Sequence, residues 1–210
     1  MERYGAGPII IVDYDPAWPV MFEQERAILH TALGSLLVTC EHVGSTAVPG
    51  LAAKPIIDLL VGVRSLGEAE SHCIEPLRAL GYNHIPDYKS WLTEELFFRK
   101  GIPGPWTHHI HMMQPSSPLW ERRLLFRDYL RTHREAADTY ANLKRSLALE
   151  CGDNIAAYRD AKTAFIEETM LKARNDQGRN SSEAIPAKRG DRLNHYRRKW
   201  TGPKSRIRAT

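Results

Sequence analysis

Apolar residues in the first part of the chain recur with two different periods, which predict one helix between two short strands. Residues 18–37 place apolar side chains such as Phe22 and Leu29 at helical spacing, so they predict an amphipathic helix. Residues 9–12 before it and 38–43 after it are short apolar runs of the kind found in strands. A Pro-Gly pair soon afterwards predicts a loop before the next strand.

The most apolar segment of the chain contains one charged residue. Residues 55–63, PIIDLLVGV, are typical of a central strand buried on both faces, except that Asp58 interrupts them. A carboxylate in such a segment is costly to bury unless it is paired, binds a metal ion or lies at the exposed end of its strand. Residues 66–80 are expected to form the next helix, which Gly81 ends. Asp58 is therefore the first candidate for a functional residue.

The second half of the chain predicts a β-hairpin followed by helices. Strand-like runs at 95–100 and 108–114 are joined by a segment rich in proline and glycine, so they predict an antiparallel pair. Residues 117–149 begin with a Ser-Pro pair suited to a helix start and predict a helical region with a break near Thr132. A last helix is expected over residues 153–174. These elements indicate an α/β (α+β) fold, a mixed sheet flanked by helices.

Composition and charge divide the chain into a globular part and a basic tail. Of the 210 residues, 42% are apolar and 26% are charged, as in ordinary soluble proteins. Residues 175–210 contain ten Lys and Arg against three Asp and Glu, a net charge of +7. The whole chain carries +4, so the first 174 residues carry −3. We therefore expect one domain at 1–174 and a basic, largely disordered tail at 175–210.

The tail leaves two interpretations open. It is either a solvated segment without a function, or a contact for nucleic acid or another polyanion through residues 197–200, RRKW. No run approaches the roughly 18 apolar residues of a membrane span, and the first residues lack a signal-peptide pattern, so we expect a cytoplasmic protein without membrane contact. The three cysteines form no CxxC pair, which argues against a disulfide framework or a cysteine zinc site.

A glycine-serine turn precedes the strand that contains Asp58. Gly44 and Ser45 follow the preceding strand, and the backbone N–H groups of such a turn can hold phosphate oxygens. A carboxylate on the neighbouring strand can hold Mg²⁺ against the same phosphates. Gly44, Ser45 and Thr46 are therefore expected to bind phosphate, with Asp58 as a metal ligand and catalytic residue.

This arrangement resembles the polymerase-beta-like nucleotidyltransferases. Their pattern is a hydrophobic residue, a glycine and a glycine or serine, then a spacer and two carboxylates one residue apart on the next strand. Val43, Gly44, Ser45 and Asp58 match it, whereas Leu60 stands where the second carboxylate belongs. Because paired carboxylates position two cations in a two-metal mechanism, the resemblance implies a weakened or altered nucleotidyl transfer.

The sequence is more closely similar to the GrpB family, which is placed in that superfamily. The similarity covers about residues 9–173. Its motifs are VDYDPAWPVMFEQE, EHVGSTAVPGLAAKPIIDLLVGV, HHIHMM, YANLKRSLA and YRDAKTAFIEE. The second of these is long and specific, so the chain is identified as a member of the family, for which a strand with a single carboxylate is typical. GrpB-like domains also occur fused to a coenzyme A biosynthetic kinase, which implies an accessory role as an alternative.

Two histidines are the other candidate metal ligands. His109 and His111 are two positions apart on a predicted strand, so both lie on one face, opposite Ile110 and Met112. The third carboxylate of the superfamily comes from a comparable strand, and the resemblance implies that these histidines replace it beside Asp58. We expect them to bind a metal ion, or phosphate when protonated. The alternative is a polar sheet face with solvated or hydrogen-bonded histidines.

Basic residues near these motifs are candidates for phosphate contacts. Lys54 precedes Pro55, which favours an extended backbone, and a lysine beside the Gly-Ser turn is a suitable counter-charge for phosphate during catalysis. Arg99, on the strand next to the histidines, is a similar candidate. For each of them the alternative is an ordinary position on the protein surface.

Two Tyr-Lys pairs occur in the predicted C-terminal helices. Tyr140 and Lys144 are four positions apart, as are Tyr158 and Lys162, so each pair lies on one helix face. The resemblance implies that a helix after the catalytic domain directs a lysine to the triphosphate and an aromatic ring to the base or sugar. We therefore expect Lys144, Tyr158 and Lys162 to contact the nucleotide, with ordinary exposed helix positions as the alternative.

These observations leave competing functions. The first is metal-dependent transfer of a nucleotidyl group from a nucleoside triphosphate to a small molecule or protein, with Mg²⁺ or another divalent cation on Asp58. The second is a non-catalytic module that binds a nucleotide or a phosphorylated metabolite, because the second carboxylate is missing. The third is a nucleic-acid partner that the basic tail binds.

Overall fold

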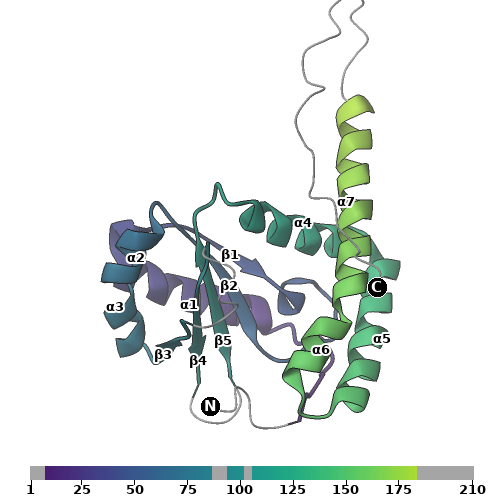
Figure 1. The fold of residues 1–210 in the computed structure, drawn as a ribbon, viewed down its shortest axis with the longest axis horizontal. Coiled ribbons are helices and arrows are strands. Elements are labelled where there is room, and N and C mark those ends of the chain that lie inside the picture. The colour runs from purple at the N-terminus through teal and green to yellow at the C-terminus, as the bar shows by residue number, and fades with distance from the viewer. Residues whose placement is uncertain (1–7, 87–93, 102–105, 184–210) are drawn as a thin grey trace, which may run out of the picture.

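The computed structural model of the chain describes residues 8–86, 94–101 and 106–183, which form one β-sheet with helices on both faces (Figure 1). Its strands run in the order β1-β2-β5-β4-β3; β2 and β5 are parallel, and the other neighbours are antiparallel. The predicted mixed sheet flanked by helices is therefore confirmed. The strands are β1 (Leu37–Val43), β2 (Ile57–Val63), β3 (Tyr82–His84), β4 (Leu96–Lys100) and β5 (His108–Met113).

Strand β2 lies inside the sheet, as its apolar sequence predicts. Leu59 belongs to the larger hydrophobic core on one face, and Leu60 packs in a smaller cluster on the other. Asp58 is opposite Val43 of β1 on one side and opposite His109 of β5 on the other. The strand register therefore places Asp58 between the turn that follows β1 and the histidine strand.

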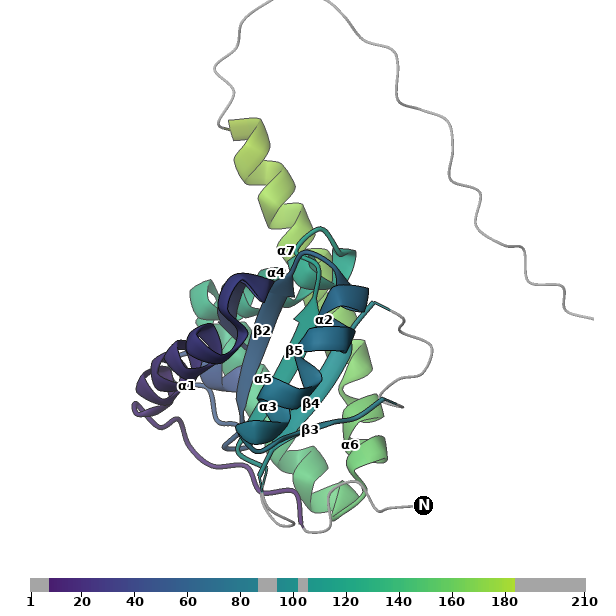
Figure 2. The same cartoon turned by 90° about the vertical axis from the view of Figure 1, so that its left-hand side faces the viewer.

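Three helices from the first half of the chain cover one face of the sheet (Figure 2). Their apolar side chains bury against the strands: Leu29 and Leu77 are fully buried in the same cluster as Ile57 and Ile110. This face holds the larger core, and no residue of these three helices lines the cavity described below. The helices are α1 (Trp18–Leu33), α2 (Leu66–His72) and α3 (Ile74–Ala79).

Four helices from the second half lie on the opposite side of the sheet (Figure 1). Trp120 packs against Leu60 and Met113, while Tyr140 packs in a cluster with the loop residue Leu51. These contacts hold the helices near the beginning of β2, where Asp58 lies. The helices are α4 (Pro118–Thr132), α5 (Arg134–Cys151), α6 (Ile155–Ala161) and α7 (Thr163–Glu183).

The predictions for the N-terminal elements need correction. Residues 9–12 form no strand; Val12 makes only an isolated bridge to Ala53. Helix α1 ends at Leu33, because Gly34 adopts a φ of 52° and begins a short 3₁₀ helix.

The helix predicted at 66–80 is two helices that meet at Cys73. Pro76 explains the break, because it has no N–H to bond to the preceding turn. The short edge strand β3 that follows was not predicted from the sequence.

The last predicted helix also differs. It is divided at Lys162 into α6 and α7, and its N-cap is Asn154, whose side chain accepts a hydrogen bond from the Ala157 N–H. Helix α7 continues past Arg174 to Glu183, so the beginning of the expected disordered tail is helical. Residues 184–210, including the RRKW segment, lie outside the described residues, and the division into domain and tail stays a prediction.

The predictions for four strands and for the start and break of the helical region after them are confirmed. Strands β1, β2, β4 and β5 occur where expected, and β4 and β5 form the antiparallel pair. Ser117 caps α4 by accepting a hydrogen bond from the Leu119 N–H at 3.2 Å, and the helical region breaks at His133. Cys40, Cys73 and Cys151 are all free thiols. Within the described ranges, no helix has the length and apolar character needed to cross a bilayer.

Candidate functional site

The turn after β1 is held against β2 by close packing and hydrogen bonds. Gly44 has a φ of 72°, and a Cβ atom at this position would lie 2.9 Å from Asp58 Cγ, so only glycine leaves room for the carboxylate. The Thr46 hydroxyl donates to the Ile56 carbonyl at 3.1 Å and lies 3.0 Å from His42 Nε2. Thr46 lines the cavity, but its hydroxyl already fixes the turn, so a role in binding phosphate stays a prediction.

Asp58, His109 and His111 converge on one point beside this turn. Asp58 Oδ1 lies 3.2 Å from His109 Nδ1 and 3.6 Å from His111 Nε2. One ligand atom from each residue falls within 4.8 Å of the other two. Burial opposes ionisation of the carboxyl group, yet the hydrogen bonds from both histidines outweigh it and hold the pKa of Asp58 well below its ordinary range. The three side chains thus bring an anionic oxygen and two imidazoles together, a set that could hold one cation.

Two further observations fit a metal ion at this cluster. His109 Nε2 is a buried ring nitrogen without a hydrogen-bond partner among the described residues. Burial lowers the pKa of His109 despite the neighbouring Asp58, which favours the neutral imidazole that metals require. His108, by contrast, points to the other face of the sheet, where its Nε2 lies 3.9 Å from Glu25.

A buried ion pair stands behind the second histidine. The Glu95 carboxylate bonds to His111 Nδ1 and accepts two hydrogen bonds from the Arg123 guanidinium, at 3.0 and 2.9 Å. Burial alone would raise the pKa of Glu95, but the neighbouring His111 and Arg123 outweigh burial and lower this pKa to about 2. Sequence reasoning missed both Glu95 and Arg123. The predicted hairpin brought Glu95 near the histidine strand, but no local pattern joins Arg123 of α4 to it.

Lysines approach the cavity from the loop before β2 and from the C-terminal helices. Lys54 Nζ lies 5.3 Å and Lys162 Nζ 4.2 Å from the centre of the Tyr158 ring. Burial lowers the pKa of both lysines, that of Lys162 to about 8. The predicted Tyr158/Lys162 pair therefore does share one face, and Lys54 joins it from a distant part of the chain.

The second predicted pair is buried more deeply. Lys144 is 2% exposed, donates a hydrogen bond to the Ala52 carbonyl and lies 4.7 Å from the centre of the Tyr140 ring. Burial lowers the pKa of Lys144 to about 7, helped by the neighbouring positive charge of Lys162. Lys144 is thus no ordinary exposed lysine, which was the alternative considered from the sequence.

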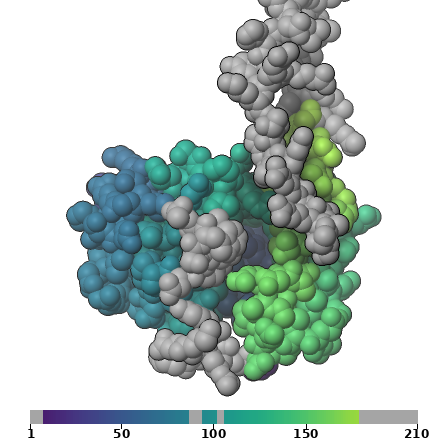
Figure 3. All heavy atoms as spheres, in the orientation of Figure 1, coloured from purple at the N-terminus to yellow at the C-terminus, as the bar shows by residue number. Residues whose placement is uncertain are grey.

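These groups surround one cavity of about 320 Å³ between the sheet and helices α5 and α6. Figure 3 shows the surface hollowed where the green C-terminal helices border the teal and blue part of the chain. Arg99 of β4 lines it as well, with its guanidinium 5.3 Å from the Phe97 ring. All predicted site residues line this cavity: Gly44, Ser45, Thr46, Lys54, Asp58, Arg99, His109, His111, Lys144, Tyr158 and Lys162. Sequence reasoning missed Glu95, Phe97, Arg123, Phe126 and Arg159.

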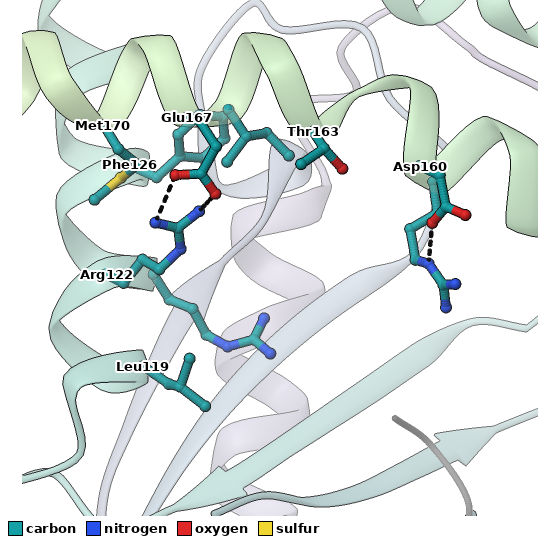
Figure 4. Close-up of a pocket in the computed structure, with 10 residues that line it drawn as sticks. Leu119, Arg122, Phe126, Asp160, Thr163, Glu167 and Met170 are labelled. Carbon is teal, nitrogen blue, oxygen red and sulfur yellow. Dashed lines mark hydrogen bonds and ion pairs between the residues drawn. The ribbon is translucent and has the colours of Figure 1, made fainter. Parts of the chain in front are cut away.

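A second cavity, of about 490 Å³, adjoins the first between α4 and α7 (Figure 4). Arg123, Phe126 and Arg159 line both cavities. Its other walls include Met170 and the ion pair in which Arg122 donates to Glu167 at 2.6 Å. We call the first cavity, which Asp58 and the lysines line, the charged compartment. The second cavity beside it is larger and more apolar.

Leu60 occupies the position at which the nucleotidyltransferase pattern has its second carboxylate. It is fully buried and packs with Val43, Met113 and Trp120. Apolar packing therefore replaces a second acidic ligand, and the described residues offer one carboxylate, Asp58, at this end of β2.

The chain is similar in sequence to parts of two longer proteins. The chain is 38% identical to the UPF0157 protein YqkA of Bacillus subtilis, over 85% of this chain and 51% of YqkA. It is 33% identical to a dephospho-CoA kinase of Mycolicibacterium paratuberculosis, over 82% of this chain and 47% of that protein. The chain thus spans about half the length of these two relatives.

A solved structure agrees with the fold. The crystal structure of the conserved protein GrpB from Enterococcus faecalis is 36% identical in sequence, with a TM-score of 0.73, and the match covers 80% of this chain and 99% of that one. The family model described as GrpB protein matches residues 8–172, which include the sheet, the histidine strand and helices α4 to α6. The chain therefore belongs to the GrpB family.

Proposed function

We propose that the cavity binds a nucleoside triphosphate together with one divalent cation, whereas the nucleotidyltransferases that the sequence resembles use two. One observation carries the proposal: a potential cation site lines the same cavity as the buried Lys144 and the partly buried Lys54 and Lys162. Asp58, His109 and His111 would hold the cation, which would neutralise phosphate charge. Lysines that are costly to bury are retained where an anion compensates their charge.

The phosphate groups are assigned to the charged compartment. Lys54 and Lys162 flank the Tyr158 ring, and the turn at Gly44 and Ser45 presents backbone N–H groups beside Asp58. Bound phosphate would also raise the depressed pKa of Lys162 again, because an anion favours the charged ammonium. The adjoining cavity is large enough for an organic group attached to the phosphates.

Nucleotidyl transfer is the reaction that this arrangement supports best. An acceptor oxygen would attack the α-phosphorus, the bond to the β-phosphate would break, and pyrophosphate would leave. Lys54, Lys144 and Lys162 would stabilise the negative charge that moves to the leaving group. The acceptor is a small molecule or a protein group in this proposal.

A second candidate is a non-catalytic module that binds a nucleotide or a phosphorylated metabolite. The apolar packing of Leu60 favours it, because a two-metal site has no second carboxylate there. The similarity to about half of a protein named dephospho-CoA kinase is in keeping with an accessory role. Contact with nucleic acid through residues 197–200 stays a prediction, since these residues lie outside the described ranges.

Calorimetric titration of the full chain with the four common nucleoside triphosphates, with Mg²⁺ or Mn²⁺, tests the proposal. We expect binding to weaken at least about tenfold in Lys54→Met and Lys162→Met, because each loses a charge-assisted contact. Lys172→Met on the exposed part of α7 is the matched control. Pyrophosphate release that Asp58→Asn abolishes would establish transfer, and binding without release across a panel of acceptors would favour the accessory role. Absence of binding by every nucleotide would overturn nucleotidyl transfer and would limit the accessory role to a phosphorylated metabolite.

A further inference from the structure

The ligand set at Asp58 differs from the one that Mg²⁺ prefers. Mg²⁺ binds oxygen ligands in near-octahedral geometry, usually with carboxylates and water. The cluster here presents one carboxylate and two imidazoles. Imidazole nitrogens suit divalent cations of the transition series and zinc, whose affinity for such sites exceeds that of magnesium.

We infer that the cluster selects a transition-series divalent cation or Zn²⁺ over Mg²⁺, and that Glu95 is the positioning residue that directs His111 Nε2 to it. This inference deepens the proposed function. It rests on that function only in assigning the cation a role in binding phosphate. The metal-binding part stands on the geometry alone. It can therefore fail or succeed independently of nucleotide binding.

The three ligands are placed by regular structure. Asp58 and His109 are register partners on the parallel strands β2 and β5, and His111 follows two positions along the same strand face. Ligands on adjacent strands keep their separation better than ligands on loops do. Gly44 lies against the Asp58 carboxylate, and because it has no side chain it leaves the carboxylate in place.

The hydrogen-bond partner of His111 determines which ring nitrogen can bind a metal. Because the Glu95 carboxylate only accepts hydrogen bonds, His111 Nδ1 must carry the proton. A metal ion can then bind only through Nε2, where it takes the place of a proton; this nitrogen lies 3.6 Å from Asp58 Oδ1. A carboxylate that accepts from the outer nitrogen of a metal-bound histidine is a common support in metal sites.

Glu95 is itself held in place. Its side chain is 2% exposed, and Arg123 donates two hydrogen bonds to it from α4. Charge-assisted bonds of this kind keep the carboxylate ionised and fix its direction. The neighbouring Glu94 is exposed and bonds to the Ser117 hydroxyl, so it offers a matched control at the adjacent position.

The test is titration of the chelator-treated full chain with Co²⁺, Zn²⁺, Mn²⁺ and Mg²⁺ salts, without nucleotide. Visible absorption follows Co²⁺, and calorimetry follows the others. We expect one ion per chain and weaker binding of Mg²⁺ than of Co²⁺ or Zn²⁺. Glu95→Gln should weaken Co²⁺ binding about 10- to 100-fold and change its absorption spectrum, while Glu94→Gln should do neither.

A measurement on the metal-free protein covers the case in which Glu95→Gln fails to fold. Nitrogen NMR of the histidine rings in the unaltered chain should show His111 protonated on Nδ1, and Arg123→Gln should weaken Co²⁺ binding whereas Arg122→Gln should not. Equal or tighter binding of Mg²⁺, or a His111 ring whose Nδ1 carries no proton, would overturn the inference. Absence of all metal binding would overturn it too. Titration with inorganic triphosphate in the presence of chelator then tests the phosphate site by itself, so the two failures are distinguishable.

Discussion

The carboxylate of Asp58 occupies the space that a side chain on Gly44 would need. The two residues lie on neighbouring segments, since Gly44 follows the β1 residue that pairs with Asp58. A Cβ atom on Gly44 would come within 2.9 Å of Asp58 Cγ and closer still to Oδ2. The turn and the candidate metal ligand are therefore one structural unit.

Gly44→Ala is expected to damage both stability and the site. A backbone with a φ of 72° and a ψ of −170° is accessible mainly to glycine, and the strain costs about 1–3 kcal/mol of the free energy of unfolding. The added methyl group must also displace Asp58, so Co²⁺ affinity should fall at least about tenfold. Gly34→Ala is the control: its φ is 52° and its Cβ meets no atom within 4 Å. Chemical denaturation and Co²⁺ titration check both variants, and normal Co²⁺ binding by Gly44→Ala would contradict the prediction.

Tyr158 is expected to act on phosphate binding through the two lysines beside it. Removing the ring in Tyr158→Leu loses both ammonium–ring contacts, each worth about 0.5–2 kcal/mol, and lets Lys54 and Lys162 move apart. Affinity for inorganic triphosphate should fall several-fold. Tyr158→Phe keeps the ring and should bind almost as the unaltered chain does. Equal losses in the two variants would show that the hydroxyl, rather than the ring, matters.

Lys144 is expected to make stability depend on pH. Burial lowers its pKa from 10.5 to about 7, so between these values the unfolded chain binds more protons than the folded one. The free energy of unfolding should therefore rise with pH from about 7 upward, by up to about 1.4 kcal/mol per pH unit from this residue. Below pH 7 both states are protonated and the contribution is constant.

The comparison with Lys144→Met isolates this effect from other titrating groups. The difference in unfolding free energy between the unaltered chain and the variant should change steadily from pH 7 to 9 in urea denaturation. Lys172→Met, at an exposed position of α7, should leave the slope of the unaltered chain in place. A constant difference for Lys144→Met across this range would refute the lowered pKa.

Glu25 is expected to be a major contributor to stability on the opposite face of the sheet. Its buried carboxylate accepts hydrogen bonds from Lys100 at 2.8 and 2.9 Å and from the Tyr82 hydroxyl at 3.0 Å. Glu25→Ala leaves these donors without their acceptor and should cost about 3–5 kcal/mol. Glu23→Ala, which breaks an exposed pair with Arg26, should cost less than about 1 kcal/mol. Urea denaturation measures both, and similar small losses would contradict the assigned role of Glu25.

Local patterns were sufficient for several parts of the site. The alternation of HHIHMM predicted that His109 and His111 share a face, because side chains of a strand point alternately to its two sides. The almost continuous apolar run of residues 55–63 likewise predicted that Asp58 lies on a central strand. The spacing of Tyr158 and Lys162 predicted one helix face, since residues four positions apart are neighbours on a helix.

Other predictions failed where a local rule met a competing contact. Residues 9–12 have strand-like composition, yet they make only a single bridge, from Val12 to Ala53, and a hydrogen bond from the Ile9 N–H to the Gly152 carbonyl. A strand is stable only when a neighbouring chain segment pairs with it, and that is not encoded in the segment itself.

The sequence by itself determined most of the strands, turns and helices, and which of their residues share a face, because these properties depend mainly on neighbours along the chain. Only the tertiary structure decided that Glu95 and Arg123 support His111, and that Lys54 meets Tyr158 across the cavity. Those contacts join residues far apart in the chain. Their geometry follows from how whole helices pack on the sheet, where burial of the apolar faces of α4, α5 and α6 outweighs any preference of the individual charged residues.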